Sequence, residues 1–118
     1  MLLLCYPKCT TCQRAQKWLD SQNIKYIYRD IKQANPTYAE LKACLGRSGQ
    51  PIKKLFNTSG LQYKALNLKE KLPLMNEEDC LKLLATDGML VKRPLVVSND
   101  FVLIGFKEAE WEELFGAV

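Results

Sequence analysis

The sequence predicts an α/β fold in which a small mixed sheet is flanked by helices. Two observations predict it. The chain begins with strand-like, helix-like and strand-like segments at residues 2–6, 9–21 and 24–30, and it ends with two strand-like segments followed by a helix. A strand–helix–strand unit of about thirty residues favours two parallel strands joined by a right-handed crossover. The two closing strands, separated by a short turn, favour an antiparallel hairpin.

The first strand and helix are indicated by their apolar residues. Residues 2–6 (Leu-Leu-Leu-Cys-Tyr) suit a short buried strand, and Pro7 and Lys8 supply the turn after it. The helix over residues 9–21 carries apolar side chains on one face, at Cys12, Ala15 and Leu19. We expect that helix to end at Asn23, and the β-branched and aromatic residues that follow predict the second strand.

The middle of the chain is expected to be helical. Thr37 and Glu40 have the spacing of a capping box, which predicts a helix that stops at Gly46. Two short helices are expected within residues 50–66. Asn76 precedes three acidic residues and is typical of a helix N-cap, so a further helix is expected to follow it.

The last quarter of the chain completes the fold prediction. Residues 95–98 and 101–105 are expected to form the hairpin, and residues 107–115 the final amphipathic helix. The order β-α-β, helices, hairpin and helix is that of a thioredoxin-like fold with a helical insertion. We expect one domain over residues 1–118, because a chain of this length can bury a core without disulfides or metals.

Composition and charge exclude several classes of protein. The formal net charge of +4 arises from lysines spread among acidic residues, which is typical of a solvated surface rather than a nucleic-acid patch. The absence of histidine removes the commonest general base and zinc ligand. No segment has the length of a membrane span and no signal peptide is visible, so we expect a cytoplasmic protein with no membrane or direct nucleic-acid partner.

Cys9 and Cys12 form a C-x-x-C pair at the junction of the first strand and the first helix. A helix N-terminus carries a partial positive charge and unpaired N–H groups, and Lys8 is adjacent, so this place favours a thiolate at Cys9. Cys12 lies one turn further on and is close enough to form a disulfide with it. In a reducing cytosol such a pair is typical of a redox centre. Two buried cysteines that act as small apolar residues are the alternative.

The spacing of Cys5 relative to Cys9 and Cys12 suggests a metal site, which we reject. Cys5, Cys9 and Cys12 have the C-x3-C-x2-C spacing of the radical-SAM enzymes, whose thiolates hold an iron–sulfur cluster. Those enzymes need a β/α barrel of about 250 residues, and Cys5 falls within a strand instead of a loop that could wrap a cluster. Cys5 is therefore expected in the core. Cys44 and Cys80, which lie beside leucines, are expected at buried apolar positions, and no metal site is predicted.

Arg93 and Pro94 form a second candidate site. A proline at the entry to a strand can follow a cis peptide bond. In thioredoxin-like folds such a proline packs against the reactive dithiol, and its loop presents backbone groups to the substrate. Arg93 would then lie near Cys9, where its guanidinium favours a thiolate or binds an anion. A surface arginine before a structural proline is the alternative.

Three segments carry a resemblance to a known family: residues 6–12 (Tyr-Pro-Lys-Cys-Thr-Thr-Cys), 91–97 (Val-Lys-Arg-Pro-Leu-Val-Val) and 104–108 (Ile-Gly-Phe-Lys-Glu). They resemble the arsenate-reductase-like family, the glutaredoxin-related ArsC type that includes the Spx branch of transcriptional regulators. The resemblance implies a thioredoxin-like fold of glutaredoxin type and a nucleophilic Cys9. It also implies a substrate site with Lys8, Arg93 and Pro94, and no resident cofactor beyond an external thiol such as glutathione or thioredoxin.

The sequence departs from the arsenate reductases of this family at two positions. Those enzymes carry further arginines at the end of the short central helix and beyond the last strand, where this chain has Asn57 and Phe106. An oxyanion held by Arg93 alone would be poorly compensated, because each charge-assisted contact contributes about 1.5–3 kcal/mol. The reductases also lack a cysteine at the position of Cys12, whereas Spx-like members have one.

These residues favour a cytosolic thiol–disulfide oxidoreductase in which Cys9 attacks a disulfide substrate and Cys12 resolves the mixed disulfide. The resemblance adds two alternatives. One is an Spx-like redox sensor that binds RNA polymerase, and the other is an arsenate reductase linked to glutathione or thioredoxin. The sequence ends soon after the last helix, without the C-terminal extension expected of Spx-type regulators, and this favours the enzyme or a member of an uncharacterised branch of the family.

Overall fold

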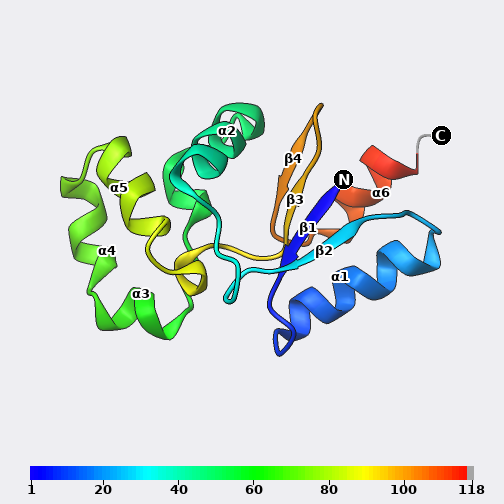
Figure 1. Ribbon diagram of the computed structural model, residues 1–118, viewed down its shortest axis with the longest axis horizontal. Helices are drawn as coiled ribbons and strands as arrows, with labels where there is room; N and C mark the ends of the chain where they lie inside the picture. The colour runs from blue at the N-terminus through cyan, green and yellow to red at the C-terminus, as the bar shows by residue number, and fades with distance from the viewer. Residues whose placement is uncertain (117–118) are drawn as a thin grey trace.

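The computed structural model describes residues 1–116 and contains one four-stranded sheet with helices on both faces (Figure 1). The strands are β1 (Leu2–Cys5), β2 (Ile27–Asp30), β3 (Leu95–Val97) and β4 (Val102–Ile104). They lie in the order β2-β1-β3-β4; β1 and β2 are parallel, and β3 is antiparallel to both β1 and β4. The prediction of a small mixed sheet is therefore confirmed.

The helices divide into those that cover the sheet and those of the insertion. α1 (Thr10–Ser21) and α6 (Glu108–Phe115) cover one face, and α2 (Tyr38–Ser48) covers the other. The insertion comprises η1 (Ile52–Leu55), α3 (Leu61–Ala65), α4 (Leu68–Lys71), η2 (Leu72–Leu74), α5 (Glu77–Leu84) and η3 (Gly88–Leu90). In Figure 1, α3, α4 and α5 stand beyond α2 and away from the sheet. No helix within residues 1–116 is long and apolar enough to cross a membrane.

Side chains on the two faces of the sheet belong to two separate hydrophobic clusters. Leu3 and Cys5 of β1 pack with Cys12 of α1 and Trp111 of α6. The side chain between them in sequence, Leu4, packs with α2 and the insertion instead. Successive residues of a strand face opposite sides of a sheet. This register therefore places Cys5 on the face covered by α1, beneath Cys12.

The second strand is shorter than the sequence predicts. It begins at Ile27 instead of residue 24. Asn23 takes up a left-handed conformation with φ of 55°, and the amide of Ile24 returns to the carbonyl of Leu19, 3.0 Å away. The first residues of the apolar run thus complete the end of α1 and cannot pair with β1. The prediction that α1 ends near Asn23 is confirmed.

The helix after the capping box is longer than the sequence predicts. It continues through Gly46 to Ser48, so the predicted stop at Gly46 is wrong. The chain leaves the helix at Gly49, whose φ of 66° suits a residue without a Cβ. The predicted short helix near residue 52 is a 3-10 turn, and the helical turns within residues 68–74 were not predicted at all.

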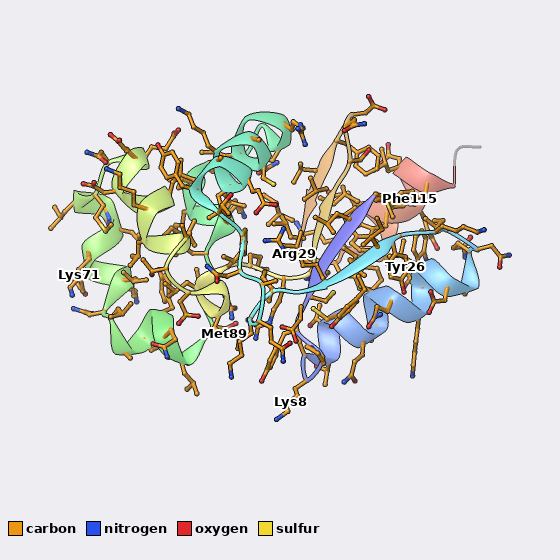
Figure 2. All side chains as sticks on the ribbon, viewed as in Figure 1. Lys8, Tyr26, Arg29, Lys71, Met89 and Phe115 are labelled. Atoms are coloured by element: carbon orange, nitrogen blue, oxygen red, sulfur yellow. The ribbon has the colours of Figure 1, made fainter. Side chains whose placement is uncertain are left out.

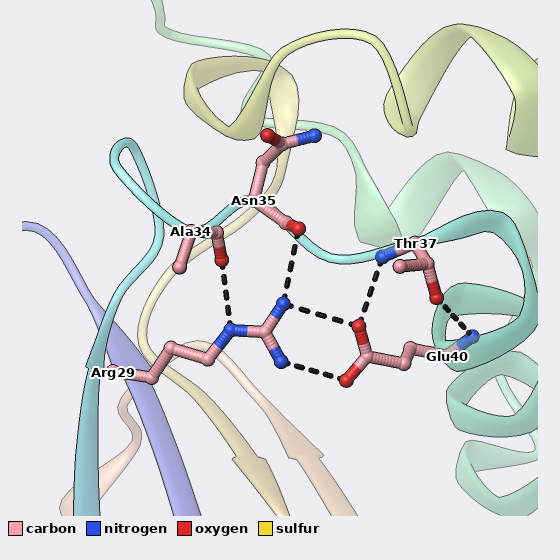
Figure 3. A network of polar contacts seen from close by, with 5 residues as sticks. All are labelled: Arg29, Ala34, Asn35, Thr37 and Glu40. Carbon is pink, nitrogen blue, oxygen red and sulfur yellow. Dashed lines mark hydrogen bonds and ion pairs between the residues drawn. The ribbon is translucent and has the colours of Figure 1, made fainter.

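A network of polar contacts fixes the start of α2 against β2 (Figure 3). Arg29 of β2 forms a two-pronged pair with Glu40, with N–O distances of 2.6 and 3.1 Å, and also donates to the carbonyls of Ala34 and Asn35. The Glu40 carboxylate accepts from the amide of Thr37, whose hydroxyl accepts in turn from the amide of Glu40. The predicted capping box is therefore present, and its acidic member also anchors the helix to the sheet.

Candidate functional site

Cys9 occupies the N-cap position of α1. Its amide donates to the carbonyl of Tyr6 at 3.0 Å, which closes the turn after β1, and its carbonyl accepts the first helical hydrogen bond from Gln13 at 3.0 Å. The Cys9 side chain makes no capping hydrogen bond and is partly exposed. The unpaired N–H groups and the dipole at this end of the helix favour negative charge there.

Cys12 lies between two other thiols. Its side chain is 1% exposed and makes hydrogen bonds with Cys5, beneath it in β1, and with Cys9, at the start of the helix. The hydrogen bond from Cys5 is the largest of several effects that lower the pKa of Cys12 from 9.0 to about 7. The backbone of Tyr6, the Cys9 thiol and the charge of Arg93 act in the same direction, while burial acts against them.

Cys5 experiences the opposite effect. Its hydrogen bond to Cys12, its complete burial and the nearby sulfur charges raise its pKa well above the ordinary range. The proton is therefore held on Cys5 and the negative charge forms on Cys12. Cys5 acts as an S–H donor to a buried thiolate, a role that the sequence did not indicate. The prediction that Cys5 lies in the core is confirmed.

The other two cysteines are remote from this cluster. Cys44 is 4% and Cys80 2% exposed, as predicted, and burial raises the pKa of both thiols. All five cysteines are free. Within the described residues, no group of three or more histidine, cysteine or acidic side chains has an arrangement that could hold a metal ion.

Arg93 reaches the same region from the loop before β3. The Arg93–Pro94 peptide bond is cis. The guanidinium carbon of Arg93 lies 5.3 Å from the centre of the Tyr6 ring, a cation–π contact. Its Nε and Nη1 atoms are buried and have no hydrogen-bond partner among the described residues. Two unpaired charged donors beside a thiol cluster are suited to an anionic group on an incoming molecule.

Tyr6 is the member of this site that sequence reasoning missed. Its carbonyl holds the Cys9 turn, and its ring lies under Arg93 and 5.9 Å from the Nζ atom of Lys32. The sequence assigned Tyr6 no role of its own, because it was only one residue of the motif that resembles the ArsC type. Its contacts with Lys32 and Arg93 join segments that are distant in sequence. An aromatic residue just before the Pro-x-Cys turn was the one available signal.

Comparison with known proteins decides the family. The model of the ArsC family matches residues 4–114. The chain belongs to the ArsC family.

Several ArsC-related proteins are similar over nearly the whole chain. The uncharacterized protein YusI of Bacillus subtilis is 50% identical over 108 residues, which are 92% of each chain. The regulatory protein MgsR of the same organism is 32% identical over 105 residues, 89% of this chain and 82% of MgsR. A crystal structure of an ArsC family related protein from Bacteroides fragilis has a TM-score of 0.93 and 59% identity, covering 96% of this chain and 95% of that one. These likenesses confirm the thioredoxin-like fold and support a function related to thiol redox chemistry.

Cys9 and Arg93 both line a groove of about 1240 Å³ between α1, the insertion and the start of α6. Asn57 and Phe106, the positions at which ArsC-type arsenate reductases were expected to carry arginines, line it as well. Phe106 packs edge-on against Trp111, with ring centres 4.7 Å apart. The two groove positions at which a reductase was expected to carry arginines therefore hold neutral side chains in this ArsC protein.

The two remaining predicted site residues, Pro94 and Lys8, differ in their burial. Pro94 is buried and lies directly before the first residue of β3. Lys8 is exposed and does not line the groove, and Figure 2 shows it projecting away from the body of the molecule. The geometry thus brings together Cys9, Cys12 and Arg93, and it leaves Lys8 outside.

Proposed function

We propose that this ArsC-family protein is a cytosolic thiol–disulfide oxidoreductase with Cys9 as the nucleophile and Cys12 as the resolving thiol. One observation carries the proposal. A partly exposed thiol at a helix N-cap touches a buried thiol one turn further on, whose pKa is lowered to about 7. A buried resolving thiol is useful only if it ionises, and the hydrogen bond from Cys5 meets that requirement.

The proposed reaction proceeds in two exchanges. The Cys9 thiolate attacks one sulfur of a substrate disulfide, so that a Cys9–substrate bond forms and the other substrate sulfur leaves as a thiolate. The Cys12 thiolate then attacks the Cys9 sulfur and releases the second substrate thiol. Two electrons pass to the substrate, and the protein is left with a Cys9–Cys12 disulfide. An external thiol such as glutathione or thioredoxin returns both cysteines to the reduced form.

Arg93 is proposed to bind an anionic group of the substrate through its two unpaired donors. Pro94 is proposed to shape the wall beside the dithiol, as the resemblance implied. Because Lys8 lies outside the groove, we propose for it only a weak contribution to the charge around Cys9.

The test is a pair of single-cysteine variants examined with an uncharged disulfide, bis(2-hydroxyethyl) disulfide. Cys9→Ser should abolish turnover, whereas Cys12→Ser should accumulate a mixed disulfide on Cys9 that is visible by intact mass. Cys44→Ser is the matched control and should behave as the unmodified protein, since Cys44 is buried away from the site. Turnover that survives in Cys9→Ser would contradict the proposal.

A redox-responsive regulator is the second candidate. It is favoured by the sequence likeness to MgsR and to the global transcriptional regulator Spx of Staphylococcus aureus, which is 29% identical over 105 residues. In that case the Cys9–Cys12 disulfide would alter affinity for RNA polymerase instead of serving turnover. Pull-down with RNA polymerase, with the protein reduced and oxidised in parallel, separates the two: a redox-dependent complex supports the regulator, and no complex in either state removes it.

A further inference from the structure

The groove beside Cys9 concentrates the positive charge of the whole molecule. Besides Arg93, six cationic residues line it: Arg14, Lys32, Lys53, Lys54, Lys92 and Lys107. Asp87 and Glu110 are the acidic residues in the same lining. Seven cations and two carboxylates leave the groove with a formal charge of +5, compared with +4 for the full chain. The rest of the molecule is therefore close to neutral.

These cations are not neutralised within the protein. The ion pairs among the described residues are Arg29 with Glu40 and Lys82 with Glu78, and none of the four lines the groove. Like charges gathered along one concave surface repel one another, and this repulsion is relieved when an anion binds. A +5 surface around the nucleophile therefore points to a negatively charged substrate.

The size and lining of the groove indicate a polypeptide. Its volume of about 1240 Å³ exceeds the usual range of about 300–1,000 Å³ for small-molecule sites. Arg93 and Lys32 both lie by the Tyr6 ring, whereas the other cations come from α1, η1 and the segments before β3 and α6, so the positive charge is supplied by several separate elements of the groove. Leu61, which is 85% exposed, and Met89 also line the groove and offer apolar contacts.

A nucleic acid fits this lining less well. Single strands bind through aromatic side chains on which bases stack. The aromatic residues of this groove are Phe56, which is 1% exposed, and Phe106, whose ring packs against Trp111. Phe56 is therefore closed to a stacking base and Phe106 is the one aromatic residue of the lining that is partly exposed, so the groove lacks a row of aromatic rings, and a nucleic acid offers no sulfur to the Cys9 thiol.

We propose that the groove selects acidic polypeptides, and that the substrate is an extended segment whose disulfide-bonded cysteine is flanked by Asp or Glu. The proposal rests on the Cys9–Cys12 exchange chemistry proposed above and names its substrate class. The substrate cysteine meets Cys9, while carboxylates on either side of it reach Lys53 and Lys54 of η1 and Lys107 before α6. The exchange itself is unchanged: the substrate disulfide gains two electrons, and Cys9 and Cys12 become oxidised.

The test compares three synthetic peptides of equal length, each with one cysteine joined to 2-mercaptoethanol as a mixed disulfide. The flanking residues are Asp and Glu, Asn and Gln, or Lys. In single turnovers with the reduced full chain as the only reductant, the second-order rate constant for the acidic peptide should exceed that for the neutral peptide by about tenfold at low salt, and the difference should shrink toward unity by about 0.5 M salt. The lysine peptide should be the poorest substrate.

Two double variants locate the effect. Lys53→Gln/Lys54→Gln should reduce the ratio of acidic to neutral turnover by about threefold or more. Lys17→Gln/Lys25→Gln removes the same charge from exposed positions outside the groove and should leave that ratio unchanged. Equal turnover of all three peptides, or an equal effect of both double variants, would overturn the proposal.

The last measurement adds a competitor to the reaction of the acidic peptide. The competitor is either a single-stranded oligonucleotide or a thiol-free acidic peptide of the same charge. Stronger inhibition by the oligonucleotide than by the thiol-free peptide would show that the groove prefers nucleic acid and would also overturn the proposal. Turnover of bis(2-hydroxyethyl) disulfide is followed in parallel. If that uncharged substrate is not reduced, the exchange chemistry itself is wrong. If it is reduced without selectivity among the peptides, only the substrate class is wrong.

Discussion

Replacement of Cys5 by alanine should shift the pH dependence of the resolving step without touching a residue that meets the substrate. Cys5 is completely buried, and its hydrogen bond is the largest cause of the lowered pKa of Cys12. In Cys5→Ala that donor is lost while burial still raises the pKa, so the pKa of Cys12 should rise from about 7 toward 9.0. The other groups that face Cys12, which are Cys9, Arg93 and the backbone of Tyr6, remain in place.

The size of the effect follows from the thiolate fraction. With a pKa of about 7, about half of Cys12 is ionised at pH 7, whereas a pKa of 9.0 leaves about 1%. A more basic thiolate is also a better nucleophile, with a Brønsted coefficient of about 0.4–0.5, and this restores about eightfold of a loss of about fiftyfold. Resolution in Cys5→Ala should therefore be slower at pH 7, by about sixfold if the pKa rises fully to 9.0. Above about pH 8 the variant should become the faster protein.

The assay follows resolution of a mixed disulfide preformed on Cys9, by stopped flow from pH 6 to pH 10. Cys5→Ser keeps an O–H donor and should retain most of the wild-type profile, which separates hydrogen bonding from packing. Thermal unfolding of all three proteins checks that the core is intact. If the Cys5→Ala profile coincides with that of the wild type, or if Cys5→Ser shifts as far as Cys5→Ala, the assigned role of Cys5 is refuted.

Three further predictions concern the scaffold and the groove. The pair with Arg29 holds the pKa of Glu40 at about 2 instead of 4.5, so its stabilisation is fully present above pH 4.5 and is lost as the pH falls toward 2. Because 41% of the Glu40 side chain is exposed, we expect Glu40→Gln to lower the free energy of unfolding by only about 1–2 kcal/mol at pH 7 and by nearly nothing at pH 2. The exposed Glu78→Gln control should cost less than about 0.5 kcal/mol, and equal losses for both variants in urea titrations would contradict the account. A Cβ at Gly88 would lie 1.7 Å from the backbone oxygen of Ile31, so Gly88→Ala should destabilise by about 3 kcal/mol or more. Gly46→Ala, inside α2 with open space around it, should stabilise by about 0.5–1 kcal/mol, and a stable Gly88→Ala protein would show the close approach to be wrong. With neutral Asn57 and Phe106 lining the groove, arsenate reduction coupled to glutathione or thioredoxin should be weak, and rapid turnover in a coupled NADPH assay would argue against this reading.

The main elements could be predicted because their signals are local. The capping box of Thr37 and Glu40, the N-cap of Asn76 and the turn before residue 101 are each set by residues within a few positions, and all are present. The predictions that failed concern the end of α2 and the helical turns within residues 68–74. Gly46 looked like a helix end, but the hydrogen bonds of α2 continue past it, and the helical turns within residues 68–74 are too short to show a period.

The candidate site was predictable only in part. The C-x-x-C pair and the Arg-Pro sequence were visible as motifs. The contact of Cys5 with Cys12 depends on the strand register, which directs Cys5 toward α1. The charge of the groove was not visible either, because the lysines that look dispersed in sequence converge only once the insertion folds beside α1. The net charge of +4 for the whole chain therefore did not indicate that the groove alone carries a formal charge of +5.

Intact-mass alkylation across a redox titration tests the central claim most directly. As the potential rises, the protein should lose two alkylation sites together, and peptide mapping should assign both to Cys9 and Cys12. Cys5, Cys44 and Cys80 should stay reduced and react only after unfolding, since they are buried. Oxidation that begins at Cys44 or Cys80, or faster alkylation of either than of Cys9 in the native protein, would contradict the account.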